Sequence, residues 1–269
     1  MADIRNKIHQ IYSLEQLSGG NTAVHLLHPM AKLLATIIFI VTVVSFGRYS
    51  FGAMLPYLFY SAIIMAVAEI PYSILLKRVL IALPFCLFVG ISNLFLITNT
   101  SFTVAGIEVS FGVVSLFTLL FRTYLSVMAV LILVAVTPFF ELTAQMRRLK
   151  VPAIFVTMFE MTYRYIGVLL EEVTSMRIAY TLRSTQKKAI DIRHMGSFVG
   201  GLLLRSFDRA ERVYSAMKCR GYALETLPQK KQKFTQKDWL YLLATSAFCM
   251  LFRIFDFQII FAKLLGGLF

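Results

Sequence analysis

The chain has 269 residues, 58% of them hydrophobic, and a mean hydropathy of +0.73, which excludes an ordinary soluble domain. Its net charge of +13 is uneven, because residues 137–238 hold 18 of the 27 Lys and Arg but 9 of the 14 Asp and Glu. Positive residues are retained on the cytoplasmic side of a membrane, so we interpret the charge as membrane topology and exclude nucleic acid as a partner.

Apolar runs predict about four membrane-spanning segments before residue 137. They cover residues 32–46, 51–68, 79–98 and 111–136, and Pro84 is expected to bend the third. A last apolar segment runs from Asp238 to Phe252, and the tail after it fits either one long tilted helix or a span with a short return. The sequence therefore predicts an all-α, polytopic integral membrane protein with membrane segments in residues 1–136 and 239–269.

Lys and Arg gather on one side of these predicted segments. That side carries Arg5, Lys7, Lys32, Lys77, Arg78, Arg147, Arg148 and Lys150, whereas the opposite side has only Arg48 before the fourth segment. The positive-inside rule therefore places the N-terminus and residues 137–238 in the cytoplasm of a multi-pass cell-membrane protein. No apolar run opens the chain, so no cleavable signal peptide is expected.

Residues 137–238 are predicted to form a cytoplasmic domain of long amphipathic helices. Thr137-Pro138 is the expected N-cap and first-turn pair of a short helix that ends near Lys150, and Val151-Pro152 opens the next helix. Steps of four and three predict one packing seam along residues 155–180. A second seam follows at Ile192, Met195, Val199, Leu202 and Ser206, where Gly196 and Gly200 would let two helices cross closely, and Gly221 suits the end of that helix.

A short pattern occurs twice in this domain. Ala179 lies one turn below Arg183, and Ala216 lies one turn below Arg220, with the two arginines 37 positions apart. A small residue at that place lets a helix end enter a groove, while the guanidinium can donate to carboxylates or to helix carbonyls. The same face of the second helix also carries Arg205, Arg209 and Arg212. Two hypotheses stay open from these residues: a docking site for a partner protein, and a solvated basic face beside an anionic membrane.

The remaining polar features do not point to an enzyme. The cysteines Cys86, Cys219 and Cys249 form no CxxC pair, and the sequence has neither a phosphate-binding loop for ATP hydrolysis nor a His-Glu-x-x-His motif. His25 and His28 could share a metal on a helix, but two imidazoles without a third ligand are weak support. We therefore expect no catalytic residue, no metal ligand and no cofactor. For Arg122, inside the fourth segment, a structural contact within the bundle is favoured over a role in a substrate path.

Several stretches carry a resemblance to a known family. Residues 203–222, from Leu-Leu-Arg-Ser-Phe-Asp-Arg to Met-Lys-Cys-Arg-Gly-Tyr, resemble the transmembrane T component of energy-coupling factor transporters, most closely its CbiQ type. Residues 145–152 and Arg164-Tyr165 are also similar to that family. Residues 28–34 match its Asp-Pro-x-x-Lys-Leu pattern, with His28 in place of the Asp.

The resemblance implies a coupling subunit of a metal importer. In that family, two Ala-Arg-Gly-like triplets at the ends of two coupling helices sit in grooves of two ATPase subunits. Leu182-Arg183-Ser184 and Cys219-Arg220-Gly221 match them in the arginine, and the first lacks both the Ala and the Gly. The implied partners are two CbiO-like ATPases and a CbiM-like membrane subunit that captures the metal, with or without a small accessory subunit.

Other functions remain as alternatives. The CbiQ type implies cobalt, often alongside cobalamin synthesis, whereas the similar NikQ type implies nickel and a shared T component would serve vitamin-binding subunits. From another class, the chain could be a membrane enzyme acting on an acidic substrate, or a scaffold without turnover. An enzyme would need polar groups that converge at one membrane depth, which Arg122 and Glu160 alone do not supply.

Overall fold

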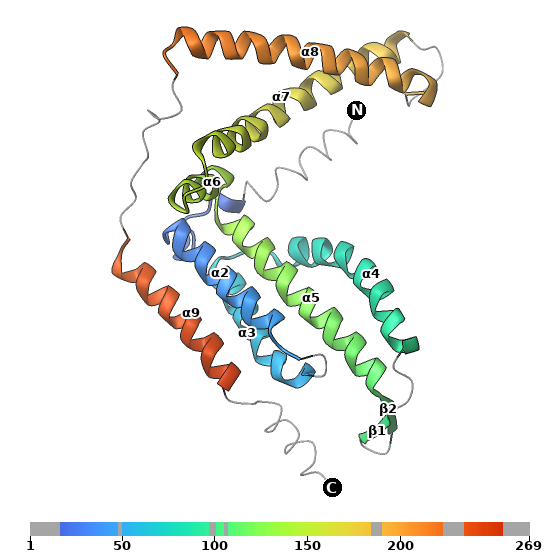
Figure 1. Cartoon of the computed structure of the whole chain (residues 1–269), viewed down its shortest axis with the longest axis vertical. Coiled ribbons are helices and arrows are strands. Elements are labelled where there is room, and N and C mark those ends of the chain that lie inside the picture. Colours follow the sequence, from blue (N-terminus) through green and yellow to red (C-terminus); the bar gives the residue numbers. More distant parts are fainter. Residues whose placement is uncertain are drawn as a thin grey trace. The chain divides into compact units, whose positions relative to one another are not determined.

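A computed structural model describes residues 17–47, 50–96, 101–104, 107–183, 190–222 and 234–254 (Figure 1). These residues form helices and one antiparallel hairpin, β1 (Ser101–Val104) with β2 (Ile107–Ser110). The all-α class predicted from the sequence is confirmed, and the hairpin is a small addition between two helices. The described residues divide into two compact units. One lies within Leu14–Leu142 and Gln232–Phe269 (the bundle unit) and the other within Thr143–Lys231 (the crossed-helix unit).

The described residues of the bundle unit include the helices α2 (Pro29–Val44), α3 (Phe51–Val67), α4 (Tyr72–Leu96), α5 (Phe111–Val136) and α9 (Gln236–Ile254). Helix α5 is central, since it packs against α2, α3 and α4, while α9 packs against α2 and α3 (Figure 1). The bundle unit contains two buried apolar clusters among its described residues. One lies around Met65 and Met128, and the other lies around Phe39 and Tyr57.

Within the part of the chain that the structure describes, three helical segments are long and apolar enough to cross a membrane: Tyr72–Ser92, Gly112–Val136 and Ala153–Arg183. The apolar helices α2 and α3 are shorter. On α4, large apolar side chains face outward, among them Leu80, Ile81, Phe85 and Phe88. An apolar surface of this kind belongs against lipid, so the chain is a membrane protein. The segment Ala153–Arg183 qualifies by length and composition, although the charge pattern predicts it to be cytoplasmic.

The predicted membrane segments agree with the helices except at their ends. Helix α4 begins at Tyr72, seven residues before its predicted start at Val79, so Lys77 and Arg78 lie within it rather than before it. Lys and Arg are good helix formers with long apolar stems, and the break falls instead at Pro71. The helix continues through Pro84, and Figure 1 shows it bent.

The junction after α5 differs from its prediction. The Thr137 N–H donates to Leu133 O at 3.0 Å, so Thr137 continues α5, and its buried hydroxyl has no partner among the described residues. The prediction of Thr137 as N-cap is therefore wrong. Helix α6 (Phe139–Arg148) begins after Pro138, whose carbonyl accepts the first helical N–H groups.

Arg122 makes the structural contact that the sequence favoured. Its Nη2 atom donates to the carbonyls of Phe46, at 2.6 Å, and Gly47, at 3.0 Å, just beyond the end of α2. Arg253 of α9 donates to Ser45 O at 3.1 Å and lies over the Phe46 ring. Two guanidinium groups thus hold the backbone that follows α2, where carbonyls lack helical partners.

The crossed-helix unit contains most of α6, together with α7 (Ala153–Arg183) and α8 (Ile192–Cys219). Arg147 of α6 pairs with Glu160 of α7 at 3.3 Å, and Thr143 donates to the other oxygen of the same carboxylate at 3.2 Å. These contacts fix the corner between α6 and α7. The predicted domain boundaries after residues 136 and 238 stay predictions.

Candidate partner-docking site

Helix α7 ends on the first of the two predicted arginines. Arg183 is its last residue, and Arg183, Ala179 and Leu182 are all exposed, Leu182 to 83%. Ser184, the third residue of the predicted triplet, lies outside the described residues. The turn below Arg183 therefore presents a small side chain and an open apolar one, as a helix end that enters a groove requires.

Helix α8 ends at Cys219, the second arginine is its C-cap residue, and Gly221 follows with the turn that ends the helix. Gly221 has φ +68°, and its N–H donates to Lys218 O, while the Tyr222 N–H donates to Met217 O, each at 3.0 Å. This pair of bonds is a Schellman motif, whose left-handed position suits glycine. The prediction for Gly221 is confirmed. Ala216, Cys219 and Arg220 are exposed beside it.

Helices α7 and α8 run antiparallel where they meet (Figure 1). Tyr180 Oη and His194 Nδ1 lie 3.0 Å apart, Gly201 lies against Met176, and Arg205 bonds to Glu172. The residue numbers of the α8 partners thus increase as those of the α7 partners decrease, as antiparallel helices require. At 1.5 Å per residue, Arg183 and Arg220 lie roughly 40 Å apart along the two helices, so one groove cannot hold both.

The predicted basic face on α8 lies toward α7 at the crossing. Arg205, Arg209 and Arg212 line an open cavity of about 140 Å³ together with Leu169, Glu172, Ser206 and Asp208. Arg205 is bound to Glu172, whereas Arg209 and Arg212 have no ion pair among the described residues. The structure therefore groups the three arginines, and it commits one of them to holding the two helices together.

The two packing seams are only partly filled. Leu169, Met176 and Tyr180 of the first seam meet α8, but Phe155, Phe159 and Ile166 remain exposed. In the second seam Ile192, Met195 and Val199 are exposed, and a Cβ atom built on Gly196 or Gly200 would meet nothing within 4 Å. The predicted close crossing at Gly196 and Gly200 is thus not formed within the described chain, because α7 packs on the face of α8 that carries Gly201.

The structure does not place His25 and His28, which were considered as possible metal ligands, on one helix. Residues 21–28 form turns rather than a helix, so the spacing does not put His25 and His28 on one face. His25 Nδ1 lies 2.6 Å from Thr22 Oγ1, and its Nε2 lies 3.0 Å from Leu17 O. His28 Nδ1 accepts from the Met30 N–H at 3.0 Å and thereby caps α2.

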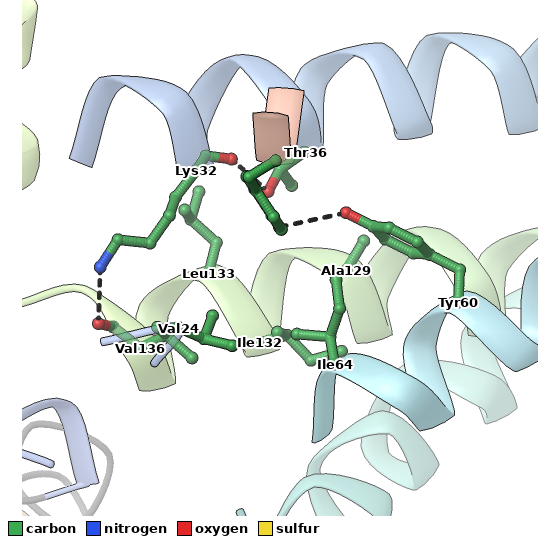
Figure 2. A pocket seen from close by; sticks show the side chains of 10 residues that line it. Val24, Lys32, Thr36, Tyr60, Ile64, Ala129, Ile132, Leu133 and Val136 are labelled. Atoms are coloured by element: carbon green, nitrogen blue, oxygen red, sulfur yellow. Dashed lines mark hydrogen bonds between the residues drawn. The ribbon is translucent and has the colours of Figure 1, made fainter. Parts of the chain in front are cut away.

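A cavity of about 20 Å³ lies inside the bundle unit (Figure 2). Lys32, Thr36, Tyr60 and Tyr241 supply its polar side chains. A space of this size holds about one water molecule, so it does not hold a hydrated metal ion.

Sequence reasoning missed the polar contacts around Lys32. The Lys32 Nζ donates to Val136 O at 3.2 Å (Figure 2), and Asp238 accepts from the His28 N–H at 2.7 Å. Thr235 and Asp238 have the spacing of a capping box, which could have marked Thr235 as the N-cap of α9 and Asp238 as the carboxylate that accepts from the Thr235 N–H. No pattern in the sequence indicates its bond to His28, 210 residues away.

The apolar helices and the open helical module define a polytopic helical membrane protein. The family model described as "Cobalt transport protein" (CbiQ) matches residues 20–232, and the chain belongs to this family. This confirms the resemblance found in the sequence and places the chain among transporter proteins rather than in a catalytic family.

Curated relatives agree with this membership. The chain is 28% identical over 244 residues to the energy-coupling factor transporter transmembrane protein EcfT of Ruminiclostridium cellulolyticum, a match that covers 85% of this chain and 91% of the relative. It is 26% identical over 211 residues to an uncharacterized protein of Methanocaldococcus jannaschii, covering 72% and 70%. A second uncharacterized protein of that organism is 33% identical over 97 residues, which is 36% of each chain.

Proposed function

We propose that this chain is the transmembrane coupling subunit, or T component, of an energy-coupling factor importer for a divalent metal ion. The observation that carries the proposal is the pair of exposed arginines, Arg183 and Arg220, that end two long helices. Membership in the cobalt transport family and the similarity to an EcfT protein support it. In this function the chain performs no chemistry and transmits movement between other subunits.

Each arginine-tipped helix end docks into its own ATPase subunit. The tips lie roughly 40 Å apart along α7 and α8, which fits two separate grooves. Ala179 and Ala216 leave room for the groove wall, and the guanidinium groups donate to acidic side chains or to helix carbonyls of the ATPases. Leu182, Ser184, Cys219 and Gly221 complete the two contacts, while Arg209 and Arg212 add positive charge to the approach.

ATP-driven closure of the two ATPases then moves the two helix ends. Since Arg205 and Glu172 join α7 to α8, and Arg147 and Glu160 join α6 to α7, the displacement passes along packed helices toward the membrane segments. The apolar faces that α7 and α8 leave open are available to a membrane-embedded substrate-binding subunit. This subunit, CbiM-like in a cobalt system, captures the metal, and the T component tilts or releases it.

The arginine-tipped helices have to lie in the cytoplasm for this mechanism. The excess of Lys and Arg in residues 137–238 supports that side of the cell membrane. Helix α7 carries Glu160, Arg164, Glu171, Glu172 and Arg177 along its length, which favours a course at the membrane surface over a span through its centre.

Cobalt is the ion that we propose is transported, in line with the family description. The test is uptake of radioactive cobalt and of nickel by cells that express the complete transporter with or without this subunit, each at matched expression. Cobalt uptake that requires this chain and ATP supports the proposal. Preference for nickel selects the nickel alternative, and vitamin uptake through several substrate-binding subunits selects a shared T component. Uptake that persists without the chain contradicts a coupling role.

A further inference from the structure

A contiguous polar network joins three helices of the bundle unit. The Asp238 carboxylate accepts from the His28 N–H at 2.7 Å, and its other oxygen accepts from the Thr235 N–H at 2.7 Å. His28 in turn accepts the Lys32 N–H in the first turn of α2, at 3.3 Å. The Lys32 Nζ donates to Val136 O at 3.2 Å (Figure 2) and to His25 O at 3.0 Å. The network thus runs from the start of α9, through the start of α2, to the end of α5.

Burial makes this network costly to break. Lys32 and Asp238 are each only 3% exposed, and His28 is 5% exposed. A buried charge without partners is strongly unfavourable, whereas an ammonium at the carbonyl end of a helix and a carboxylate at the amide end of another are both favourable. Each charge also satisfies backbone groups that lack helical partners, and hydrogen bonds of this charge-assisted kind are among the stronger ones in proteins.

Along the sequence, the network lies close to both connections between the two units. After Val136 the chain leads into α6, and the unit boundary falls between residues 142 and 143. The chain returns at residue 232, shortly before Thr235 and Asp238 begin α9. Both connections to the crossed-helix unit are therefore within a few residues, along the chain, of groups that bond to Lys32 or Asp238.

We propose that Lys32 and Asp238 are positioning residues that lock the end of α5 and the start of α9 to the first turn of α2. A displacement that reaches the bundle unit along either passage then moves all three helices together. That the displacement originates at the ATPases rests on the proposed function. The lock itself is independent of it, because its contacts all lie within the bundle unit.

The test measures amide hydrogen exchange and transport on the full transporter complex. Lys32→Met removes the ammonium, and Asp238→Asn removes the charge from the other end of the network. Each variant is expected to speed exchange about fivefold or more in all three segments, residues 26–34, 133–140 and 235–241. Ion uptake per ATP hydrolysed should fall in both variants, while the ATPases still co-purify.

Thr36→Val is the matched control, because Thr36 lines the same cavity as Lys32 and its hydroxyl donates within α2, to Lys32 O at 2.8 Å. It should leave exchange at residues 235–241 and the uptake ratio unchanged. Faster exchange that stays confined to the mutated helix and its direct partner would overturn the lock, and uniform loosening with an unchanged uptake ratio would overturn its role in transmission. If Lys32→Met does not accumulate in the membrane, Asp238→Asn decides alone. Failure of the docking proposal is distinguishable, since it appears as unchanged ATPase co-purification in Arg183 and Arg220 variants.

Discussion

Gly221→Ala tests how the second arginine is presented. Gly221 holds φ +68°, and a Cβ atom there would meet nothing within 4 Å, so the methyl group acts through the backbone alone. An L-residue in the left-handed region is destabilised by about 1–2 kcal/mol relative to glycine. That free energy corresponds to about a 5–30-fold change in the opening equilibrium of the helix end. The Schellman bonds from residues 221 and 222 should therefore open more often in the variant.

Hydrogen exchange of the purified full-length protein measures this opening at the amides of residues 221 and 222. Gly200→Ala is the matched control, since the same methyl group also meets nothing within 4 Å but lies inside α8. There alanine favours the helix by about 1 kcal/mol, so exchange at the helix end should not rise. Equal exchange in Gly221→Ala and the wild type would refute the argument that glycine is needed to end this helix beside Arg220.

Two further substitutions test the polar contacts elsewhere in the fold. Arg122→Met leaves the carbonyls of Phe46 and Gly47 without their donor, and should lower the free energy of unfolding by about 2–4 kcal/mol, read as reduced thermal stability in detergent; an unchanged melting temperature would contradict the contact. Arg147→Met leaves the Glu160 carboxylate, 29% exposed, without its cation and should destabilise the α6–α7 corner by about 1–3 kcal/mol. Adding Glu160→Gln to Arg147→Met should recover part of that loss, and fully additive losses would show that the two side chains do not interact.

The sequence predicted the helices of the bundle unit to within a few residues at most ends, because apolar runs and prolines mark them directly. The end of α6 near Lys150 was predicted from Val151-Pro152, but the conformation that ends the helix was not. Lys150 takes φ +64° there and completes a Schellman motif, a position where glycine is the usual signal. Thr137 looked like an N-cap, but the backbone of α5 continues through it. A local pattern does not show whether a residue at such a junction extends the preceding helix or caps the following one.

For the candidate site, the sequence predicted which residues end the two helices but not how the helices meet. The 3.6-residue period places Arg205 and Arg220 on one face of α8, and the structure agrees that Arg205, Arg209 and Arg212 lie together. The pattern could not tell that this face meets Glu172 of α7. Nor could it tell that the apolar face with Gly196 and Gly200 stays open. An apolar seam has the same residue spacing whether its partner helix lies in the same chain or in another subunit.

The most direct test of the central claim is ATPase co-purification with the Arg183→Glu/Arg220→Glu double variant, together with ATP-dependent cobalt uptake. Arg193→Glu, an exposed charge reversal in the first turn of α8, is the control. The account predicts that the double variant loses most of its ATPase subunits and its uptake, that each single variant loses part, and that the control keeps both. A double variant that retains wild-type co-purification and uptake would contradict the claim that these two helix ends are the docking points.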